Sequence, residues 1–126
     1  MAVCQELGLA TEDEVVPRIG VGFAGGIGQT GAVCGAVAGA VMAISLGLKR
    51  PENMEEGLGQ LAVFGEFRRR FEAEVDTIHC RELTGFDMTT AEGLQAYMTS
   101  DTPQTVCFPA VGIAYRLAVD LIKEHA

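Results

Sequence analysis

The stretch GVGFAGGIGQTGAVCGAVAG, residues 20–39, holds half of the chain's sixteen glycines and no charged residue. Glycine at this density lets backbone segments approach closely and permits turns with left-handed backbone angles. We expect a glycine loop over residues 22–31, followed by a helix over residues 32–48 that is apolar on all sides and therefore buried. Gly35, Gly39 and the alanines between them would give this helix a small, flat face for close packing.

Apolar residues spaced by three and four predict further helices on either side of this stretch. With the glycine-rich one, the expected helices cover residues 12–21, 32–48, 53–77, 91–98 and 106–124. Residues 1–9 are too short for a full helix and look like the tail of one, and residues 79–85 predict one short turn. No alternating strand pattern is visible. We therefore expect residues 1–126 to form a single all-α domain, a compact bundle of five to six helices around the buried glycine- and alanine-rich helix.

Several of these helices have recognisable first residues. Thr11 and Glu14 fit a capping box, in which Thr11 is the N-cap of the helix over residues 12–21. Asn53 can cap the long helix, and Thr89 or Thr90 can cap the helix over residues 91–98.

Two helices carry clear stripes of core residues. In the helix over residues 53–77 and just after it, the predicted stripe is Met54, Leu58, Leu61, Phe64, Phe67, Phe71, Val75 and Ile78. In the last helix it is Cys107, Val111, Ala114, Tyr115, Ala118, Leu121 and Ile122. The three consecutive arginines of the long helix lie among glutamates, which indicates a solvated helix face rather than a phosphate site. The expected i,i+4 pairs are Glu66–Arg70, Arg68–Glu72 and Arg70–Glu74.

Charge and composition exclude some classes of protein. The net charge of −8 argues against nucleic-acid binding, which needs a basic surface. Residues 19–48 are uncharged and long enough to cross a bilayer, but their glycines would break a helix, so we expect no membrane span. No secretory signal is visible, which favours the cytoplasm. In that reducing compartment, four cysteines indicate metal or redox chemistry more than structural disulfides.

The cysteines are Cys4, Cys34, Cys80 and Cys107. We expect Cys34 about one turn into its helix, where free backbone N–H groups favour its thiolate, and the last two at helix ends. Helix ends in a bundle can bring distant side chains together around an ion, but the chain has no CxxC pair. From spacing alone, a shared metal or redox site and separately buried thiols both remain open.

Other features offer weaker candidates. Residues 20–25 and 26–31 both match GxGxxG, but their surroundings do not predict the strands of a dinucleotide-binding fold, so a tight turn is the simpler interpretation. His125 lies at the C-terminal end and is expected in solvent. His79 is most simply a cap at the end of the long helix, and Asp87 is most simply a local cap in its turn.

Four segments taken together resemble a known family. They are GFAGGIGQTG at residues 22–31, CGAVAG at 34–39, CRELTGFD at 80–87, and Cys107 followed by Pro109. They resemble the redox-active protein family that is named for its CGAxxG motif and four cysteines (C_GCAxxG_C_C). The resemblance covers almost the whole chain, in the right order. It implies a helical protein with a redox or electron-transfer function and a cysteine-bound cluster.

The resemblance assigns the cysteines one by one. Cys34 matches the cysteine of CGAxxG, Cys80 the third family cysteine and Cys107 the fourth. In the family, the first cysteine begins a full helix and lies roughly two turns before an LGL-like segment, whereas Cys4 is only three residues before Leu7. Cys4 is therefore a fourth candidate outside the family's own position, and we expect the chain to lack most of its first helix.

The leading hypothesis is a cytoplasmic redox protein in which Cys34, Cys80 and Cys107 bind an iron–sulfur cluster for electron transfer, with Cys4 as a further metal ligand. Zinc is the redox-silent alternative at the same thiolates. A second hypothesis is thiol–disulfide exchange with Cys34 as the catalytic, attacking thiolate. A third is a non-catalytic interaction module with structural cysteines. A homodimer is expected because a shortened first helix would leave apolar surface uncovered, and the redox hypothesis requires a redox partner.

Overall fold

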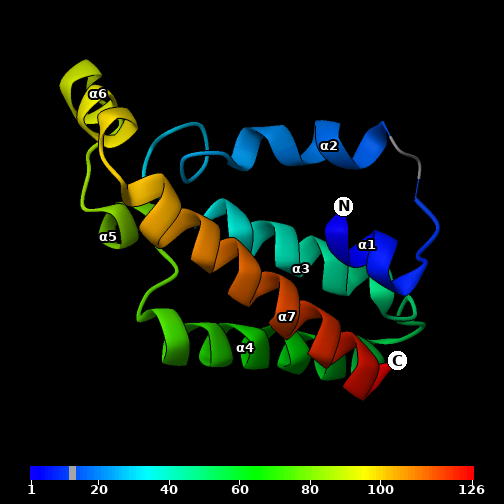
Figure 1. Cartoon of the computed structure of the whole chain (residues 1–126). Helices are drawn as coiled ribbons and strands as arrows, with labels where there is room; N and C mark the ends of the chain where they lie inside the picture. Colours follow the sequence, from blue (N-terminus) through cyan, green and yellow to red (C-terminus); the bar gives the residue numbers. More distant parts are fainter. Residues whose placement is uncertain (12–13) are drawn as a thin grey trace.

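The computed structural model describes residues 1–11 and 14–126 and shows an all-helical protein (Figure 1). The α-helices of the described residues are α1 (Ala2–Leu7), α2 (Val15–Gly20), α3 (Gly35–Gly47), α4 (Met54–Val75), α5 (Cys80–Thr84), α6 (Ala91–Thr99) and α7 (Phe108–His125). A 3₁₀ turn, η1 (Val21–Phe23), follows α2, and a π-helical turn, η2 (Pro103–Cys107), leads into α7. The described residues contain one isolated β-bridge and no strand. The predicted all-α class is confirmed.

The core lies where α3, α4 and α7 pack together, with α1 against α3 and α7 (Figure 1). Its fully buried large side chains are Ile44 of α3, Phe67 and Phe71 of α4, and Leu121 of α7. The two phenylalanine rings stack with their centroids 5.9 Å apart. Three of the cysteines lie near the ends of these helices: Cys34 and Cys107 precede α3 and α7, and Cys80 follows α4.

The glycine-rich helix α3 is less buried than the sequence predicts. Leu46 is 48% exposed, and the Cα of Gly39 faces open space within the described residues. The reason is that α2 stands away from α3, with cavities of about 420 and 550 Å³ lined by residues of both helices. The prediction of an all-round buried helix with a closely packed face at Gly39 is therefore wrong on this side.

The start of α2 also differs from its prediction. The helix begins at Val15 with Glu14 as its N-cap, so Thr11 does not cap it. A start at Glu12 would have required an N–H from Pro17 for a helical hydrogen bond, whereas a start at Val15 leaves Pro17 in the first turn, where none is needed. The predicted helical residues Glu12 and Asp13 lie outside the described residues.

The predicted long helix is confirmed as α4, and Asn53 caps it by accepting a hydrogen bond from the Glu56 amide. Its core stripe is confirmed only in the second half. Among the predicted stripe residues, Met54, Leu58 and Leu61 are 80%, 60% and 61% exposed. The neighbouring α7 runs antiparallel and ends at His125, beside residues 60 and 63 of α4. Val63 is nevertheless buried, so the reason is angular: at about 100° per residue, Met54, Leu58 and Leu61 lie on a different side of α4 from the buried face of Val63, Phe67 and Phe71.

The buried face of α7 is rotated about the helix axis relative to the predicted one. Ala114, Ala118, Leu121 and Ile122 are buried as expected, but Val111 is 54% exposed. The additional buried residues are Ala110, Leu117 and Val119. By length and composition alone, the stretch Pro103–His125 is apolar enough to cross a membrane, and it is the one such stretch in the described residues. The core helix of a globular protein passes the same test, and seven residues of α7 are buried.

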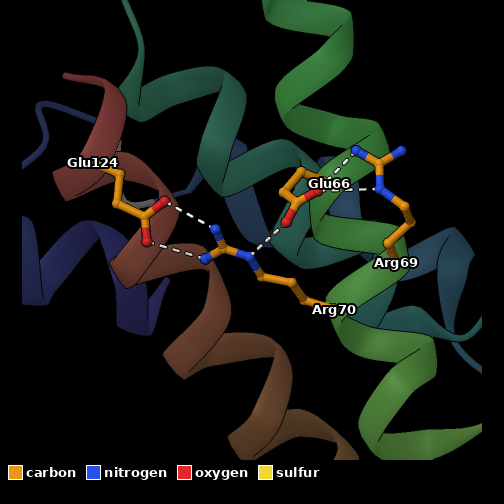
Figure 2. A network of polar contacts seen from close by, with 4 residues as sticks. All are labelled: Glu66, Arg69, Arg70 and Glu124. Atoms are coloured by element: carbon orange, nitrogen blue, oxygen red, sulfur yellow. Dashed lines mark hydrogen bonds and ion pairs between the residues drawn. The ribbon is translucent and has the colours of Figure 1, made fainter.

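The arginines of α4 form a network at the α4–α7 interface (Figure 2). Arg70 donates from Nε to Glu66 at 2.9 Å, and its two terminal nitrogens each donate to Glu124 of α7 at 3.0 Å. Arg69 donates from Nη2 to the same Glu66 at 2.7 Å. The predicted Glu66–Arg70 pair is thus confirmed, and so is the Arg68–Glu72 pair.

The predicted pair of Arg70 with Glu74 is wrong. Glu74 instead accepts from Arg116 of α7 at 2.6 Å. Spacing along one helix can identify only partners within that helix. Here α7 provides Glu124 as a partner for Arg70 and Arg116 as a partner for Glu74. Arg70–Glu124 and Glu74–Arg116 fix the antiparallel register of α4 and α7.

Candidate functional site: a cluster of three thiols

Cys34 and Cys80 lie on either side of the only β-bridge in the described residues, between Val33 and His79. The Cys34 amide donates to the carbonyl of Ile78 at 2.7 Å, and the Cys80 amide donates to the carbonyl of Ala32 at 2.7 Å. Side chains alternate along extended backbone, so both cysteine side chains leave the bridge on the side opposite to its two bridging residues. Two segments more than forty residues apart in sequence are thereby joined at their cysteines.

The bridge changes the predicted place of Cys34. The residue is the N-cap of α3, with φ −54° and ψ 132°, and not a member of its first turn. It lies before the helix because its amide already pairs with Ile78, which keeps the backbone extended. Its side chain is half-buried. Cys34 is therefore close to the free N–H groups of the helix start, although its thiol makes no capping hydrogen bond within the described residues.

The bridge also corrects the role of His79. Helix α4 ends at Val75, and His79 is an exposed residue that precedes α5 rather than a cap of the long helix. His125 is the exposed last residue of α7, as expected. Asp87 is confirmed as a local cap, because its carboxylate accepts from the Thr89 amide at 3.1 Å.

The glycine loop packs directly against Cys80. Five successive residues, 25–29, have φ between +62° and +73°, which is one turn of left-handed backbone. The Ala32 amide closes the loop by donating to the carbonyl of Gly26 at 3.0 Å. Gly26 is buried against the Cys80 side chain. Helix α2, not a strand, precedes the loop, so the arrangement is that of a tight turn and not of a dinucleotide-binding fold.

Cys107 reaches the same region from the other end of the chain. It is the last residue of the π-helical turn η2, which contacts α5. Its sulfur lies 3.2 Å from the hydroxyl of Tyr97, which comes from α6. The Tyr97 ring in turn meets Phe86 edge-on, with centroids 6.0 Å apart. Tyr97 was not among the predicted site residues, because nothing in its local sequence distinguishes it from a residue of the helix core.

Contacts between their segments bring the three cysteines into one region, because the bridge joins the segments of Cys34 and Cys80, and η2, which ends at Cys107, contacts α5, which begins at Cys80. Burial raises the pKa of the Cys80 thiol, and negative charge at Cys34 and at Cys107 raises it further. The pKa of Tyr97 also lies above its usual range, first because of burial and then because of its hydrogen bond with Cys107 and the charges of all three thiolates. Such effects need short separations. We refer to Cys34, Cys80 and Cys107 as the thiol cluster.

Cys4 lies apart from this cluster. It is 3% exposed on α1 and lines the cavity of about 420 Å³ between α1, α2 and α3, together with Phe23, Gly35 and Gly39. Its charge is not among those that raise the pKa of Cys80. Its role as a fourth ligand stays a prediction.

The donors of the thiol cluster are of the type that soft metals take. Thiolates are the usual ligands of iron–sulfur clusters and of structural zinc. All four cysteines are free in this structure. The described residues contain no group of three or more His, Cys, Asp or Glu that is spaced to hold a metal ion. The thiol cluster therefore has suitable donor atoms for a metal centre, but in this structure its side chains are not arranged around one common metal position.

Comparison with known proteins gives one match. Neither the curated proteins nor the solved structures contain a protein that matches this chain. The family described as "Putative redox-active protein (C_GCAxxG_C_C)" matches residues 1–121, with its model spanning the glycine loop and all four cysteines. The resemblance found in the sequence is thus confirmed over nearly the whole chain, and the protein belongs to the C_GCAxxG_C_C family of redox-active proteins.

Proposed function

We propose that the thiol cluster is the redox centre of this protein and that it binds an iron–sulfur cluster for electron transfer. The observation that carries the proposal is the approach of three remote cysteine segments, Cys34 and Cys80 across the β-bridge and Cys107 through the contact of η2 with α5. Free cysteines that serve only as small apolar core residues have no reason to share a site. Membership of a redox-active family supports the same conclusion.

The surrounding residues suit such a centre. The bridge at Val33 and His79 fixes the backbone of two of the ligands, and the glycine loop packs against the Cys80 side chain at Gly26. When bound, an iron–sulfur cluster supplies one-electron chemistry at a potential set by its type, its hydrogen bonds and its exposure. Cys80 is 8% exposed, so it provides the buried side of the site, and the half-buried Cys34 provides the side open to a partner.

The test is reconstitution of the protein with iron and sulfide without oxygen. We expect bound iron and sulfide in stoichiometric amounts and a broad visible absorbance. Cys34→Ser, Cys80→Ser and Cys107→Ser should each lower the iron content strongly. Cys4→Ser tests separately whether Cys4, a buried cysteine outside the thiol cluster, is a fourth ligand. A wild-type protein that binds no iron, or full iron content in the three thiol-cluster variants, contradicts the proposal.

Zinc at the same three thiols is the redox-silent form of this proposal. Metal analysis of protein purified without added metal distinguishes the two, because zinc gives a colourless protein with no response to reductant. Zinc bound by the same cysteines would keep the thiol cluster as a metal site and remove its electron-transfer role.

The second candidate is thiol–disulfide exchange, which the unequal exposure of Cys34 and Cys80 favours. The Cys34 thiolate would attack a disulfide of the partner, forming a mixed disulfide and releasing one partner thiolate. Cys80 would then attack the Cys34 sulfur, closing an internal disulfide and releasing the second partner thiol. The partner disulfide gains two electrons and the Cys34–Cys80 pair loses them. Titration of thiols with and without reductant tests it: two thiols should disappear in the oxidised wild type and none in Cys34→Ser.

We also propose that the chain forms a homodimer in the cytoplasm, and the non-catalytic interaction module remains the third candidate. Val15, Ile19, Val21 and Leu46 present exposed apolar side chains around α2 and α3, which is the kind of surface that association covers. Four free thiols suit a reducing compartment. Light scattering of the purified protein measures its mass in solution, and fractionation of cells measures its location.

A further inference from the structure

A side-chain hydrogen bond between Tyr97 and Cys107 links α6 to the thiol cluster. The Tyr97 hydroxyl and the Cys107 sulfur are 3.2 Å apart, within hydrogen-bond distance for sulfur. We propose that Tyr97 is a positioning residue, which holds the Cys107 sulfur toward Cys80 and Cys34 by this hydrogen bond. The proposal rests on the redox role of the thiol cluster for its biological meaning, but the positioning itself can be measured without any metal.

Cys107 needs such a contact because its side chain is only half-buried. It ends the π-helical turn η2, and its own backbone is helical, with φ −70° and ψ −49°. Pro109, two residues later, explains the widening of the turn. Its ring occupies the space of the carbonyl of residue 105 in a regular α-helix, and it has no N–H to donate. Partial burial leaves more than one rotamer open to the Cys107 thiol, so a hydrogen bond can decide its direction.

Tyr97 has contacts of its own besides the one with Cys107. Its ring packs edge-on against Phe86 at an interplanar angle of 71°. Its carbonyl accepts hydrogen bonds from the Ser100 hydroxyl at 2.7 Å and from the Ser100 amide at 3.2 Å. At its other end, α6 is capped by Thr90, whose hydroxyl accepts from the Gly93 amide at 3.0 Å. Its hydroxyl therefore occupies a defined place from which it can donate to the Cys107 sulfur.

The chemistry of the pair suits this role. A phenol hydroxyl donates a strong hydrogen bond, whereas a thiol is a weak donor and a thiolate is an acceptor only. The hydroxyl therefore donates to the Cys107 sulfur whenever that sulfur carries negative charge, as it does in a thiolate or as a metal ligand. Hydrogen bonds to ligand sulfurs are one of the means by which proteins tune a metal centre.

The test is cross-linking of the reduced, metal-free protein with dibromobimane, which joins two nearby thiols and becomes fluorescent. Mass spectrometry of the digested product identifies each linked pair. In Tyr97→Phe we expect links from Cys107 to Cys34 or Cys80 to fall about fivefold, the population change that one ordinary hydrogen bond produces. The Cys34–Cys80 link should be unchanged, because the backbone bridge holds that pair. The control is Tyr115→Phe, at the only other tyrosine of the chain.

A second variant separates positioning from packing. Phe86→Leu removes the edge contact but keeps the Tyr97 hydroxyl, so it should reduce the Cys107 links less than Tyr97→Phe does. Three results would overturn the proposal. Phe86→Leu could reduce the Cys107 links more than Tyr97→Phe does, Tyr97→Phe could leave those links unchanged, or Tyr97→Phe could reduce the Cys34–Cys80 link by as much as the Cys107 links. Cadmium titration, followed by the ultraviolet absorbance of thiolate–metal bonds, should show weaker binding in Tyr97→Phe. A wild type that binds neither iron nor cadmium contradicts the metal-binding function, and the cross-links then still decide the role of Tyr97.

Discussion

A Cβ atom at Gly26 would lie 2.7 Å from the Cβ of Cys80, so the glycine loop and the thiol cluster occupy adjoining space with no room for a side chain. The same atom would lie 2.6 Å from the backbone nitrogen of Ala32, which cannot move without breaking its hydrogen bond to Gly26. The backbone of Gly26 also has φ +73°, an angle that only glycine adopts freely.

Gly26→Ala should therefore lower the free energy of unfolding by about 2 kcal/mol or more. The alanine would have to adopt a left-handed backbone angle, and its Cβ would clash with the backbone of Ala32. It should also reduce the Cys34–Cys80 cross-link, since the clash displaces Cys80. Urea unfolding and dibromobimane cross-linking measure the two effects. Gly22→Ala is the control, since Gly22 has open space around its Cα in the described residues. Equal stability of the two variants would show that the loop tolerates a side chain at Gly26.

The core should be most sensitive at Phe71. This side chain is fully buried and stacks on Phe67. Phe71→Ala should cost about 3–5 kcal/mol in the free energy of unfolding, because it leaves a cavity among α3, α4 and α7. Leu61→Ala, on the exposed part of the same helix, should change it by less than about 0.5 kcal/mol. A large loss at Leu61 would mean that another molecule covers the first turns of α4 in solution.

Two glycines in helices should respond to alanine with opposite signs. A Cβ at Gly93 of α6 would lie 1.8 Å from the carbonyl oxygen of Asp87, so Gly93→Ala must shift the start of α6 and should destabilise the protein. Gly112 of α7 has open space around it in the described residues, and Gly112→Ala should stabilise the protein by up to about 1 kcal/mol through helix propensity. Thermal unfolding of the two variants beside the wild type checks both signs.

The Arg70 network makes stability depend on pH. Hydrogen bonds from Arg69 and Arg70 lower the pKa of Glu66 below its ordinary value of 4.5, and Arg70 does the same for Glu124. Carboxyl groups with a lower pKa in the folded state stabilise it fully above the unfolded value and lose this contribution as the pH falls through the folded one. Stability should thus fall below about pH 4.5.

Arg70→Gln isolates this contribution. The variant should be less stable than the wild type at pH 7, by a small amount because the network is exposed to solvent, and the difference should shrink as the pH falls below 4.5. Added salt should reduce the difference at pH 7. Urea midpoints measured from pH 7 to pH 3 test this. A difference that is constant over this range would assign the effect of Arg70 to packing of its side chain.

The sequence correctly predicts features that depend on interactions between residues close together in the chain. The spacing of Phe67 and Phe71 places both on the buried face of α4, and Asn53 and Thr90 are identified as caps by residue type alone. The same spacing fails at Leu61, because the two steps of three residues from Leu61 to Phe67 turn the predicted stripe by about 120° around the helix, and only its second half meets the buried face. Periodicity states which residues share a face, and only the neighbouring helix decides whether that face is covered.

In the candidate site, too, the residues can be identified from the sequence, whereas the contacts between them cannot. Cys34, Cys80 and Cys107 could be selected from the sequence by their residue type and by the family motif. The approach of Cys34 to Cys80 depends on a bridge between segments that are distant in sequence, which no local pattern encodes. That bridge moves Cys34 out of its helix, and a contact between α6 and η2 adds Tyr97. Both are tertiary effects.

The turn at residues 25–29 is wound in the sense opposite to every helix around it, and two of its five positions, Ile27 and Gln29, are not glycine. Each of these side chains makes the left-handed winding less favourable than it would be for glycine. Backbone hydrogen bonds maintain it, among them that of the Ala32 amide with Gly26 and that of the Cys80 amide with Ala32. The cost of the two non-glycine residues is therefore met by the same bonds that attach the loop to the segment of Cys80.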